Sequence, residues 1–475
     1  MNISIIRSGR LIAIKPFPDS LRNELTFAIM ESEYKKGKMI FTRARKTMFS
    51  ENPDDAEEYF APAGFTSRVY KHLLDLGIPK EDIAYKDIRE LKIEKPQLTL
   101  MEPLTDPQKE AIARVFTSAC GIIWMPTGVG KTYLIKQIIR ALPNTKIVIT
   151  GHDSEPLKSL YDYLVKLYGY SEVTAIGKIG KSLFPGRITI CHIKSLLKAP
   201  IDEVPLLIYD EVHGAASPER ATSLSKVPYA NMFGFSASPK GRLDQKEPII
   251  EGLFGPIIYK MPYTAARDQG LVSDIHVHIY TVKGVDRDYD THYKRRVYGV
   301  VRNEGRNLKI AQAAQKYGKY QQIVYALDDL EHVFRLRAYL PEHTPVYGSG
   351  SMTEKRYRKL DKMGLIPDGY KPIVAGEEFK LAEKFRSGEI TKAICTSVWG
   401  EGVDFPNLEV LIRADGIPGV IDCIQVPGRI TRKAEGKEVA ILVDFFDDFG
   451  RTFKNRSLSR ISNYRTTGYK VEMKE

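Results

Sequence analysis

The fold is decided by the stretch Pro126-Thr127-Gly128-Val129-Gly130-Lys131-Thr132. It follows an apolar run, 121–125, and precedes a segment with helical periodicity, the order in which a phosphate-binding loop joins a strand to a helix. Small residues let backbone N–H groups close around a polyphosphate at the positive end of the helix. Lys131 can then reach the β- and γ-phosphates of ATP, and the Thr132 hydroxyl can hold Mg²⁺. The strict pattern has glycine where Met125 stands, so a plain strand-to-helix turn is the alternative interpretation.

Two acidic residues follow a second buried-strand pattern, Leu206 to Tyr209. The sequence there is Asp210-Glu211-Val212-His213, and ligands of α/β proteins bind at the carboxyl ends of parallel strands. Asp210 is suited to Mg²⁺, and Glu211 to orienting or deprotonating the attacking water. Together with the loop, these acids predict ATP hydrolysis, whereas a pair of solvated loop acids is the alternative.

A glutamine, Gln108, lies just before a predicted helix, 109–116. Its amide offers a donor and an acceptor and can therefore read both hydrogen-bonding edges of adenine. Taken alone, a glutamine in this position is more often a surface residue.

Apolar runs alternate with helical segments through most of the chain, which predicts parallel sheets. The first block, 96–265, has runs at Ile122–Met125, Lys146–Thr150, Arg187–Cys191, Leu206–Tyr209 and Met232–Phe235. The second block, 266–450, has runs at Ile275–Val282, Gln322–Tyr325, Lys392–Cys395, Glu409–Ile412 and Val439–Val443. We therefore predict two tandem α/β domains with parallel sheets, a small N-terminal α+β domain at 1–95, and a basic C-terminal tail at 451–475.

The composition indicates a polyanionic partner. The net charge is +12 and the pI is about 9.2, which for an ATP-hydrolysing protein favours nucleic acid, although a merely basic surface remains the alternative. Four scattered cysteines show no zinc or disulfide spacing, and no run of eighteen apolar residues occurs. We expect a soluble protein in the cytoplasm, without a membrane partner.

Short motifs, taken together, resemble those of superfamily 2 helicases of the DExH type. In order they are motif I at Pro126 to Thr132, motif II at Asp210 to His213, motif III at Ser236-Ala237-Ser238, motif V from Thr396 to Asp404, and motif VI at Gln425-Val426-Pro427-Gly428-Arg429-Ile430-Thr431-Arg432. The resemblance covers most of residues 104–432. It implies that both α/β domains are RecA-like and that ATP and Mg²⁺ bind in the cleft between them.

The resemblance also implies roles for individual residues. Arg429 and Arg432 supply positive charge to the γ-phosphate, a role that their spacing of three also suits on physical grounds. Catalytic positions are further implied for His213 and Gln425, nucleotide contacts for Gly402 and Asp404, and relay of the nucleotide state for Ser236 and Ser238. Nucleic-acid contacts are implied for Thr150, His152, Ser195, Thr396 and Ser397.

Within the superfamily, the chain is most similar to phage UvsW-type recombination helicases. The segments that carry this resemblance are Phe60-Ala61-Pro62-Ala63-Gly64-Phe65, Leu76-Gly77 and Asp444-Phe445-Phe446-Asp447-Asp448. It implies a monomeric DNA helicase or branch-migration motor that acts on forks, four-way junctions and R-loops, in the host cytoplasm if the chain is phage-encoded.

Secondary DNA contacts are predicted at three basic segments, 35–46, 292–296 and the 451–475 tail, each of which can instead be a solvated face. An insertion at 351–377 is a candidate strand-separating or junction-binding element. Three other functions remain open: a double-stranded DNA translocase that separates no strands, a DExH RNA helicase, and a non-catalytic nucleic-acid clamp.

Overall fold

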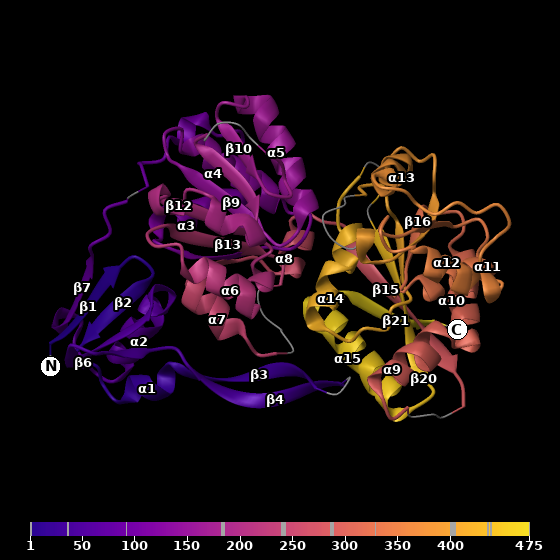
Figure 1. The fold of residues 1–475 in the computed structure, drawn as a ribbon, viewed down its shortest axis with the longest axis horizontal. Helices are drawn as coiled ribbons and strands as arrows, with labels where there is room; N and C mark the ends of the chain where they lie inside the picture. Colours follow the sequence, from indigo (N-terminus) through magenta and orange to yellow (C-terminus); the bar gives the residue numbers. More distant parts are fainter. Residues whose placement is uncertain are drawn as a thin grey trace. The chain divides into compact units, whose positions relative to one another are not determined.

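The computed structural model describes residues 2–35, 38–91, 93–181, 186–238, 244–285, 289–327, 329–399, 405–434, 437 and 439–474, with only the backbone described for 32–35 and 38–41. The chain divides into two units (Figure 1), one of Met1–Met125 and Gly130–Met261, the other of Pro126–Val129 and Pro262–Glu475. Among the described residues, no helix has the length and apolar character needed to cross a membrane.

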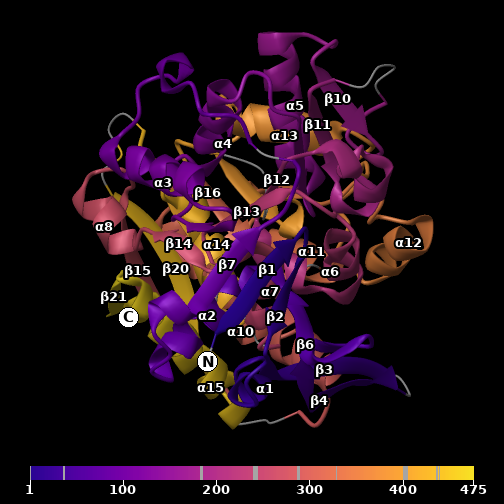
Figure 2. The same ribbon diagram turned by 90° about the vertical axis from the view of Figure 1, so that its left-hand side faces the viewer.

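The first unit begins with the predicted α+β domain, which we call the accessory domain. Its sheet has the order β5-β6-β2-β1-β7, and only β1 and β7 pair in parallel. The strands are β1 (Ile3–Ser8), β2 (Leu11–Lys15), β5 (Ser50–Asn52), β6 (Asp55–Pro62) and β7 (Ile83–Asp87), with helices α1 (Ser20–Glu24) and α2 (Thr66–Asp75). Helix α2 lies beside this sheet (Figure 2). Alternating residues of β1 and β2 are buried against Val69 and Leu73 of α2.

A long antiparallel hairpin, β3 (Thr26–Lys35) and β4 (Lys38–Thr47), projects from the accessory domain (Figure 1). The described basic side chains of the predicted 35–46 segment, Arg43, Arg45 and Lys46, are exposed. The other lysines of that segment lie outside the described side chains.

The rest of the first unit is a seven-stranded, all-parallel sheet of order β10-β11-β9-β12-β13-β8-β14. Its strands are β8 (Gly121–Trp124), β9 (Ile147–Gly151), β10 (Val173–Ile176), β11 (Ile188–His192), β12 (Leu206–Asp210), β13 (Asn231–Ser236) and β14 (Ile257–Lys260). Its helices are α3 (Asp106–Thr117), α4 (Lys131–Ala141), α5 (Ser154–Tyr168), α6 (Pro218–Ser225) and α7 (Glu247–Phe254). The central strands are buried on both faces, as their apolar runs predict.

The second unit contains another seven-stranded parallel sheet, of order β17-β18-β16-β19-β20-β15-β21. Its strands are β15 (Asp274–Lys283), β16 (Gln322–Tyr325), β17 (Thr344–Val346), β18 (Lys392–Cys395), β19 (Val410–Arg413), β20 (Val439–Asp448) and β21 (Lys470–Lys474). The helices are α8 (Tyr263–Asp268), α9 (His292–Arg296), α10 (Glu304–Lys316), α11 (Leu330–Tyr339), α12 (Glu354–Lys362), α13 (Glu377–Arg386), α14 (Val420–Gln425) and α15 (Arg451–Thr467). The predicted fold class, two tandem RecA-like α/β domains with an accessory domain, is confirmed.

The segment 451–475 is not a tail, and this prediction is wrong. It forms α15 and the edge strand β21, which pairs with β15. Arg460 of α15 is 1% exposed and donates to Asp444 at 2.9 Å, while Tyr464 is fully buried and donates to the same carboxylate at 2.7 Å. The alternation of basic and aromatic residues therefore comes from a helix that buries an ion pair, so these two side chains are unavailable to DNA.

The predicted insertion, 351–377, packs onto the second domain. Leu360 of α12 and Ile373 are buried in one cluster with Phe334 of α11 and Tyr347. The segment is therefore an integral part of this domain, and α12 turns its charged residues toward solvent.

Replacing Arg460 by Met should strongly destabilise the second domain. The substitution keeps most of the side-chain volume but leaves the buried Asp444 without its cation, a change that costs about 3–5 kcal/mol. Urea unfolding measures the effect. The matched control is Arg465→Met on the exposed side of the same helix, which should change stability by at most about 0.5 kcal/mol. Equal stability of the two variants would contradict a buried structural role for Arg460.

Candidate nucleotide site

The predicted phosphate-binding loop joins β8 to α4. Gly128 and Gly130 have φ angles of 92° and 99°, in the left-handed region that side chains with a Cβ rarely adopt. Gly130 is the N-cap of α4, so the loop delivers the chain directly to the positive end of that helix. Thr132 is exposed in the first turn. This conformation presents backbone N–H groups as an anion site.

Lys131 lies beside the acidic pair that ends β12. Its Nζ is 3.6 Å from Oε1 of Glu211, and only 8% of the lysine is exposed. Glu211 has a positive φ of 54°, and its N–H donates to Oδ1 of Asp210 at 3.1 Å. A non-glycine residue in the left-handed region is strained, and such strain clusters at active sites and ligand-binding positions. The loop lysine and the first acids of motif II thus form one site.

The two carboxylates differ in their ionisation. Burial and the neighbouring Glu211 raise the pKa of Asp210 to about 7. Burial also opposes ionisation of Glu211, but the Lys131 ammonium and a hydrogen bond with His213 outweigh it and hold the Glu211 pKa far below its usual value. Glu211 is therefore an anion at neutral pH, whereas Asp210 ionises fully only with a further cation nearby.

Ser236 connects motif II to motif III. Its hydroxyl donates to Oε2 of Glu211 at 3.1 Å and accepts the N–H of Ser238 at 3.1 Å. Nδ1 of His213 lies 3.2 Å from the same hydroxyl oxygen. Both serines are fully buried at the end of β13. Direct hydrogen bonds therefore connect the Glu211 carboxylate to the end of β13.

Gln108 lies against the loop and is buried instead of being a surface residue. A Cβ on Gly130 would lie 2.9 Å from its Nε2, so the amide packs directly against the backbone of the loop. Its Oε1 accepts the N–H of Thr105 at 3.1 Å in the capping box of α3. The amide thus both starts a helix and borders the phosphate-binding loop.

The structure does not support a phosphate contact by the side chains of Thr150 or His152. Thr150 is a fully buried residue of β9. The His152 ring packs edge-on against His213 at 5.3 Å, and burial together with His213 lowers the His152 pKa to about 4. The neutral His152 ring, packed against His213 of motif II, therefore offers no charge to a phosphate.

The other predicted nucleic-acid residues lie in three different settings. Ser195 is half-buried. Its hydroxyl packs against Gly177, where an added Cβ would lie only 2.2 Å from the hydroxyl oxygen. Thr396 follows β18, is 3% exposed, and donates its N–H to Val346 at 3.1 Å. Ser397 is exposed. Of these residues, Ser397 has the most accessible side chain.

Motif VI occupies the end of α14 and a short 3₁₀ helix, Pro427–Ile430, in the second unit. Gln425 and Arg429 are half-buried, and Arg432 is exposed. The predicted nucleotide contacts Gly402 and Asp404 lie outside the described residues.

The sequence motifs did not indicate one histidine at the carboxyl ends of the strands of the first sheet. His192 ends β11, and its Nε2 lies 2.9 Å from the carbonyl oxygen of His152. Its position at the carboxyl end of a parallel strand is the signal that would have found it.

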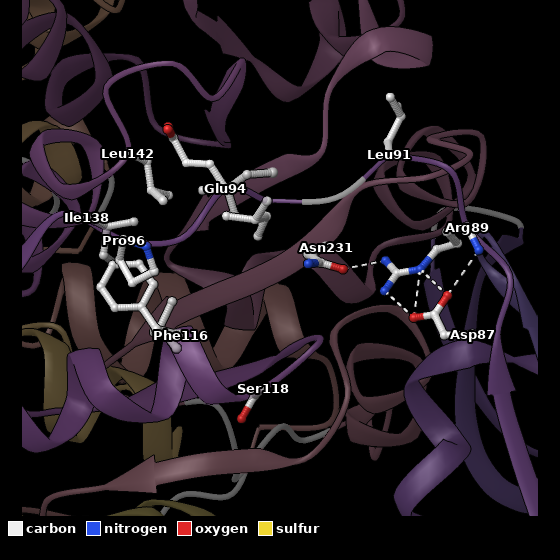
Figure 3. A pocket seen from close by; sticks show the side chains of 13 residues that line it. Asp87, Arg89, Leu91, Glu94, Pro96, Phe116, Ser118, Ile138, Leu142 and Asn231 are labelled. Atoms are coloured by element: carbon white, nitrogen blue, oxygen red, sulfur yellow. Dashed lines mark hydrogen bonds and ion pairs between the residues drawn. The ribbon is translucent and has the colours of Figure 1, made fainter.

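A separate cavity of about 320 Å³ lies at the amino ends of β12 and β13 in the first sheet (Figure 3). It is lined by the connector from the accessory domain, by α3 and α4, and by Leu206 and Asn231, the first residues of β12 and β13. Arg89 of the connector donates to Asn231 and pairs with Asp87 at 2.6 Å (Figure 3). Since these are the amino ends of the strands, this cavity is distinct from the nucleotide site.

Comparisons agree with the motif pattern. Residues 102–241 match the model of the type III restriction enzyme res subunit, and residues 374–434 that of the helicase conserved C-terminal domain. The DNA 3'-5' translocase XPB2 of Sulfurisphaera tokodaii is 24% identical over 400 residues, which cover 75% of this chain and 88% of that protein.

Two solved structures are also similar. A fragment of a putative HsdR subunit of a type I restriction enzyme from Vibrio vulnificus YJ016 aligns at a TM-score of 0.56 and 18% identity, over 94% of this chain and 78% of that one. T4 UvsW aligns at a TM-score of 0.41 and 16% identity, over 100% and 99% of the two chains. That score does not decide between subgroups, and the UvsW-type resemblance stays a prediction.

Two RecA-like domains in tandem, the first with a phosphate-binding loop beside paired carboxylates, define a nucleotide-dependent motor protein. The matched family segments and the relatives support a superfamily 2 helicase.

Replacing Lys131 by Ala should abolish ATP hydrolysis, whereas Glu211→Gln should keep ATP binding and lower turnover by about 10²–10⁴-fold. The first change removes the cation of the phosphate site, and the second removes only the base that activates water. Steady-state hydrolysis and equilibrium binding of a fluorescent ATP analogue distinguish the two. Loss of nucleotide affinity in Glu211→Gln with normal turnover at saturation would contradict the role given to Glu211.

Proposed function

We propose that this chain is an ATP-dependent DNA helicase or translocase of the DExH type that remodels forked and branched DNA as a monomer. The observation that carries the proposal is the contact of Lys131 with Glu211 beside a phosphate-binding loop. The relative XPB2 is named a DNA 3'-5' translocase, which favours DNA as the polymer. The basic composition is in accord with a polyanionic track.

The site is suited to hydrolysis of ATP. The loop N–H groups and Lys131 bind the β- and γ-phosphates, and the polyphosphate then competes with Glu211 for the Lys131 ammonium. Glu211, ionised and released from that contact, orients and deprotonates the attacking water. Thr132 and Asp210 offer the hard oxygen ligands that Mg²⁺ prefers, and Mg²⁺ would neutralise phosphate charge there. Because Ser236 bonds to Glu211, motif III senses the change.

Closure of the two domains completes the reaction in this proposal. Arg429 and Arg432 of motif VI supply the positive charge that the γ-phosphate side lacks, a contribution of roughly 10³–10⁵-fold in related phosphoryl transfers. Binding of DNA across both domains favours closure, so hydrolysis is coupled to stepping along the strand.

Arg432→Ala should reduce DNA-stimulated hydrolysis far more than ATP affinity, because the arginine acts only when the domains close. Hydrolysis with and without DNA, together with nucleotide binding, tests this. Lys433→Ala, at the next exposed basic residue, is the matched control. An equal loss of basal and stimulated hydrolysis, with a lowered melting temperature, would point to misfolding and remove the proposed role.

The accessory domain is positioned to act as a fixed part of the first motor domain. Arg68 of α2 makes a two-pronged ion pair with Glu251 of α7, at 2.9 and 2.7 Å, and also bonds to Glu24 at 2.6 Å. Gly64 packs so tightly on α7 that a Cβ there would lie 2.0 Å from the Glu251 carbonyl oxygen. These contacts support a domain that moves as one body with the nucleotide site.

The β3–β4 hairpin is held by the same body. Met30 of β3 donates its N–H to the carbonyl of Asp244 at 2.8 Å, six residues beyond Ser238 of motif III. Arg43 and Arg45, two apart on β4, share one face of the hairpin, and we propose that this face binds DNA junctions.

Removing the charges of Arg43, Arg45 and Lys46 by substitution with Ala should weaken binding of forked and four-way DNA, while hydrolysis stimulated by single strands persists. The slope of log K against log salt for junction binding should become shallower by up to about 2.7, since each lost phosphate contact contributes about 0.9. Fluorescence anisotropy over a salt series measures both. The control removes three exposed lysines elsewhere in the domain, Lys71, Lys80 and Lys86. Unchanged junction affinity and slope would leave the hairpin a structural role.

The proposal as a whole is tested by ATP hydrolysis against single-stranded, duplex, forked and four-way DNA and against RNA. Greatest stimulation by branched DNA, with displacement of a labelled strand, is the expected result. Stimulation by duplex DNA without strand displacement would identify a translocase, and stimulation by RNA alone an RNA helicase. Absence of hydrolysis with every polymer would leave the non-catalytic clamp.

A further inference from the structure

A cavity of about 370 Å³ lies in the second domain at the carboxyl ends of β16 and β18. Asp329 follows β16 and Thr396 follows β18, two adjacent strands of the sheet. The remaining wall comes from α9, from the π-helical turn after it, and from α12, which packs beside α11 (Figure 1). The carboxyl edge of a parallel sheet is where ligands of α/β domains bind.

The wall of this cavity has a surplus of positive charge. Four cations line it, Arg296, Arg302, Arg356 and Lys359, against two carboxylates, Asp329 and Glu331. Arg302 grips Glu331 with two hydrogen bonds of 2.6 and 3.0 Å, and Arg296 lies 3.5 Å from Asp329. These two pairs account for both carboxylates.

The two remaining cations lie on the exposed face of α12. Arg356 donates to the Ser351 carbonyl at 2.8 Å, and within the described parts of the chain neither Arg356 nor Lys359 has a carboxylate within ion-pair distance. A cavity wall with two uncompensated cations is electrostatically suited to an anion.

The surroundings favour a polymer over a small anion. Tyr293 at the rim is 68% exposed, which leaves its ring accessible for stacking on a base. The cationic residues of the wall also lie outside the two matched family segments, 102–241 and 374–434.

We propose that this cavity holds backbone phosphates of a DNA strand, with Arg356 and Lys359 as the phosphate contacts and Tyr293 as a stacking platform. The inference rests on the proposed function and deepens it, because it gives the 351–377 insertion a role as part of the DNA track. Thr396 of motif V lines the same cavity, so a strand bound there contacts a helicase motif of the second domain directly.

The test compares three variants of the full chain. In Arg356→Ala/Lys359→Ala, the affinity for a labelled single strand should fall about tenfold at low salt, and the slope of log K against log salt should become shallower by about 1.4, from about 0.7 per phosphate contact. Lys355→Ala/Lys362→Ala removes the same charge from exposed positions of the same helix that do not line the cavity, and it should bind nearly as the wild type does. Arg356→Lys/Lys359→Arg keeps both charges and should restore binding.

The results distinguish failure of the proposed function from failure of the proposed DNA site in the cavity. Wild-type protein that neither binds DNA nor hydrolyses ATP in response to it would overturn the proposed function. Wild-type protein that binds DNA, with an unchanged affinity and slope in Arg356→Ala/Lys359→Ala, would overturn only the cavity. An equal loss in both alanine variants would show a general basic field, and a loss that persists in the charge-conserving variant would show local disruption; either result also overturns the cavity.

Discussion

The contact between the Lys131 ammonium and the Glu211 carboxylate is the interaction on which the first motor domain depends. It brings together the start of α4 and the end of β12, which are separated by about half of the domain in sequence. The parallel register places the ends of β12 and β13 side by side, so that Asp210 pairs with Phe235 one residue before Ser236. Because parallel strands all end at one edge, three separate motifs meet there without any long side chain having to reach across the sheet.

The same edge carries a polar network that is connected and largely buried. Glu211 accepts from Ser236, which also accepts from the Ser238 backbone, and His213 lies against the same hydroxyl. This chain of hydrogen bonds joins the Glu211 carboxylate, which follows β12, to the end of β13, and in a low-dielectric setting such bonds are strong. The accessory domain extends this coupled region, since Arg68 pairs with Glu251 and the hairpin bonds to the segment after motif III.

Basic residues of this chain serve two different purposes, and sequence alone does not separate them. Arg306, Arg413 and Arg460 are buried with Asp447, Asp415 and Asp444 as their partners. The pairs of Arg306 and Arg460 join α10 and α15 to β20, whereas Arg413 and Asp415 lie at the end of β19 and just after it. None of the three arginines contributes to an exposed basic surface. Arg43, Arg45, Arg356 and Lys359, in contrast, are exposed. A segment rich in arginine and tyrosine therefore indicates a DNA-binding surface only if its arginines are exposed and not buried in ion pairs.

By itself, the sequence determined the class of fold and the central strands of both sheets, and it singled out the lysine and the acids that the structure brings together, Lys131, Asp210 and Glu211. The strands that it predicts correctly are the inner ones, such as β9 and β16, which are buried on both faces and are therefore written as apolar runs. The strands that it missed, β10, β14, β17 and β21, are the four sheet edges, where one side lacks a partner strand and polar residues are tolerated. Only the tertiary structure decided that Gln108 borders Gly130, that Thr150 is buried, and that the last helix is part of a core, because each depends on which distant side chain occupies the neighbouring space.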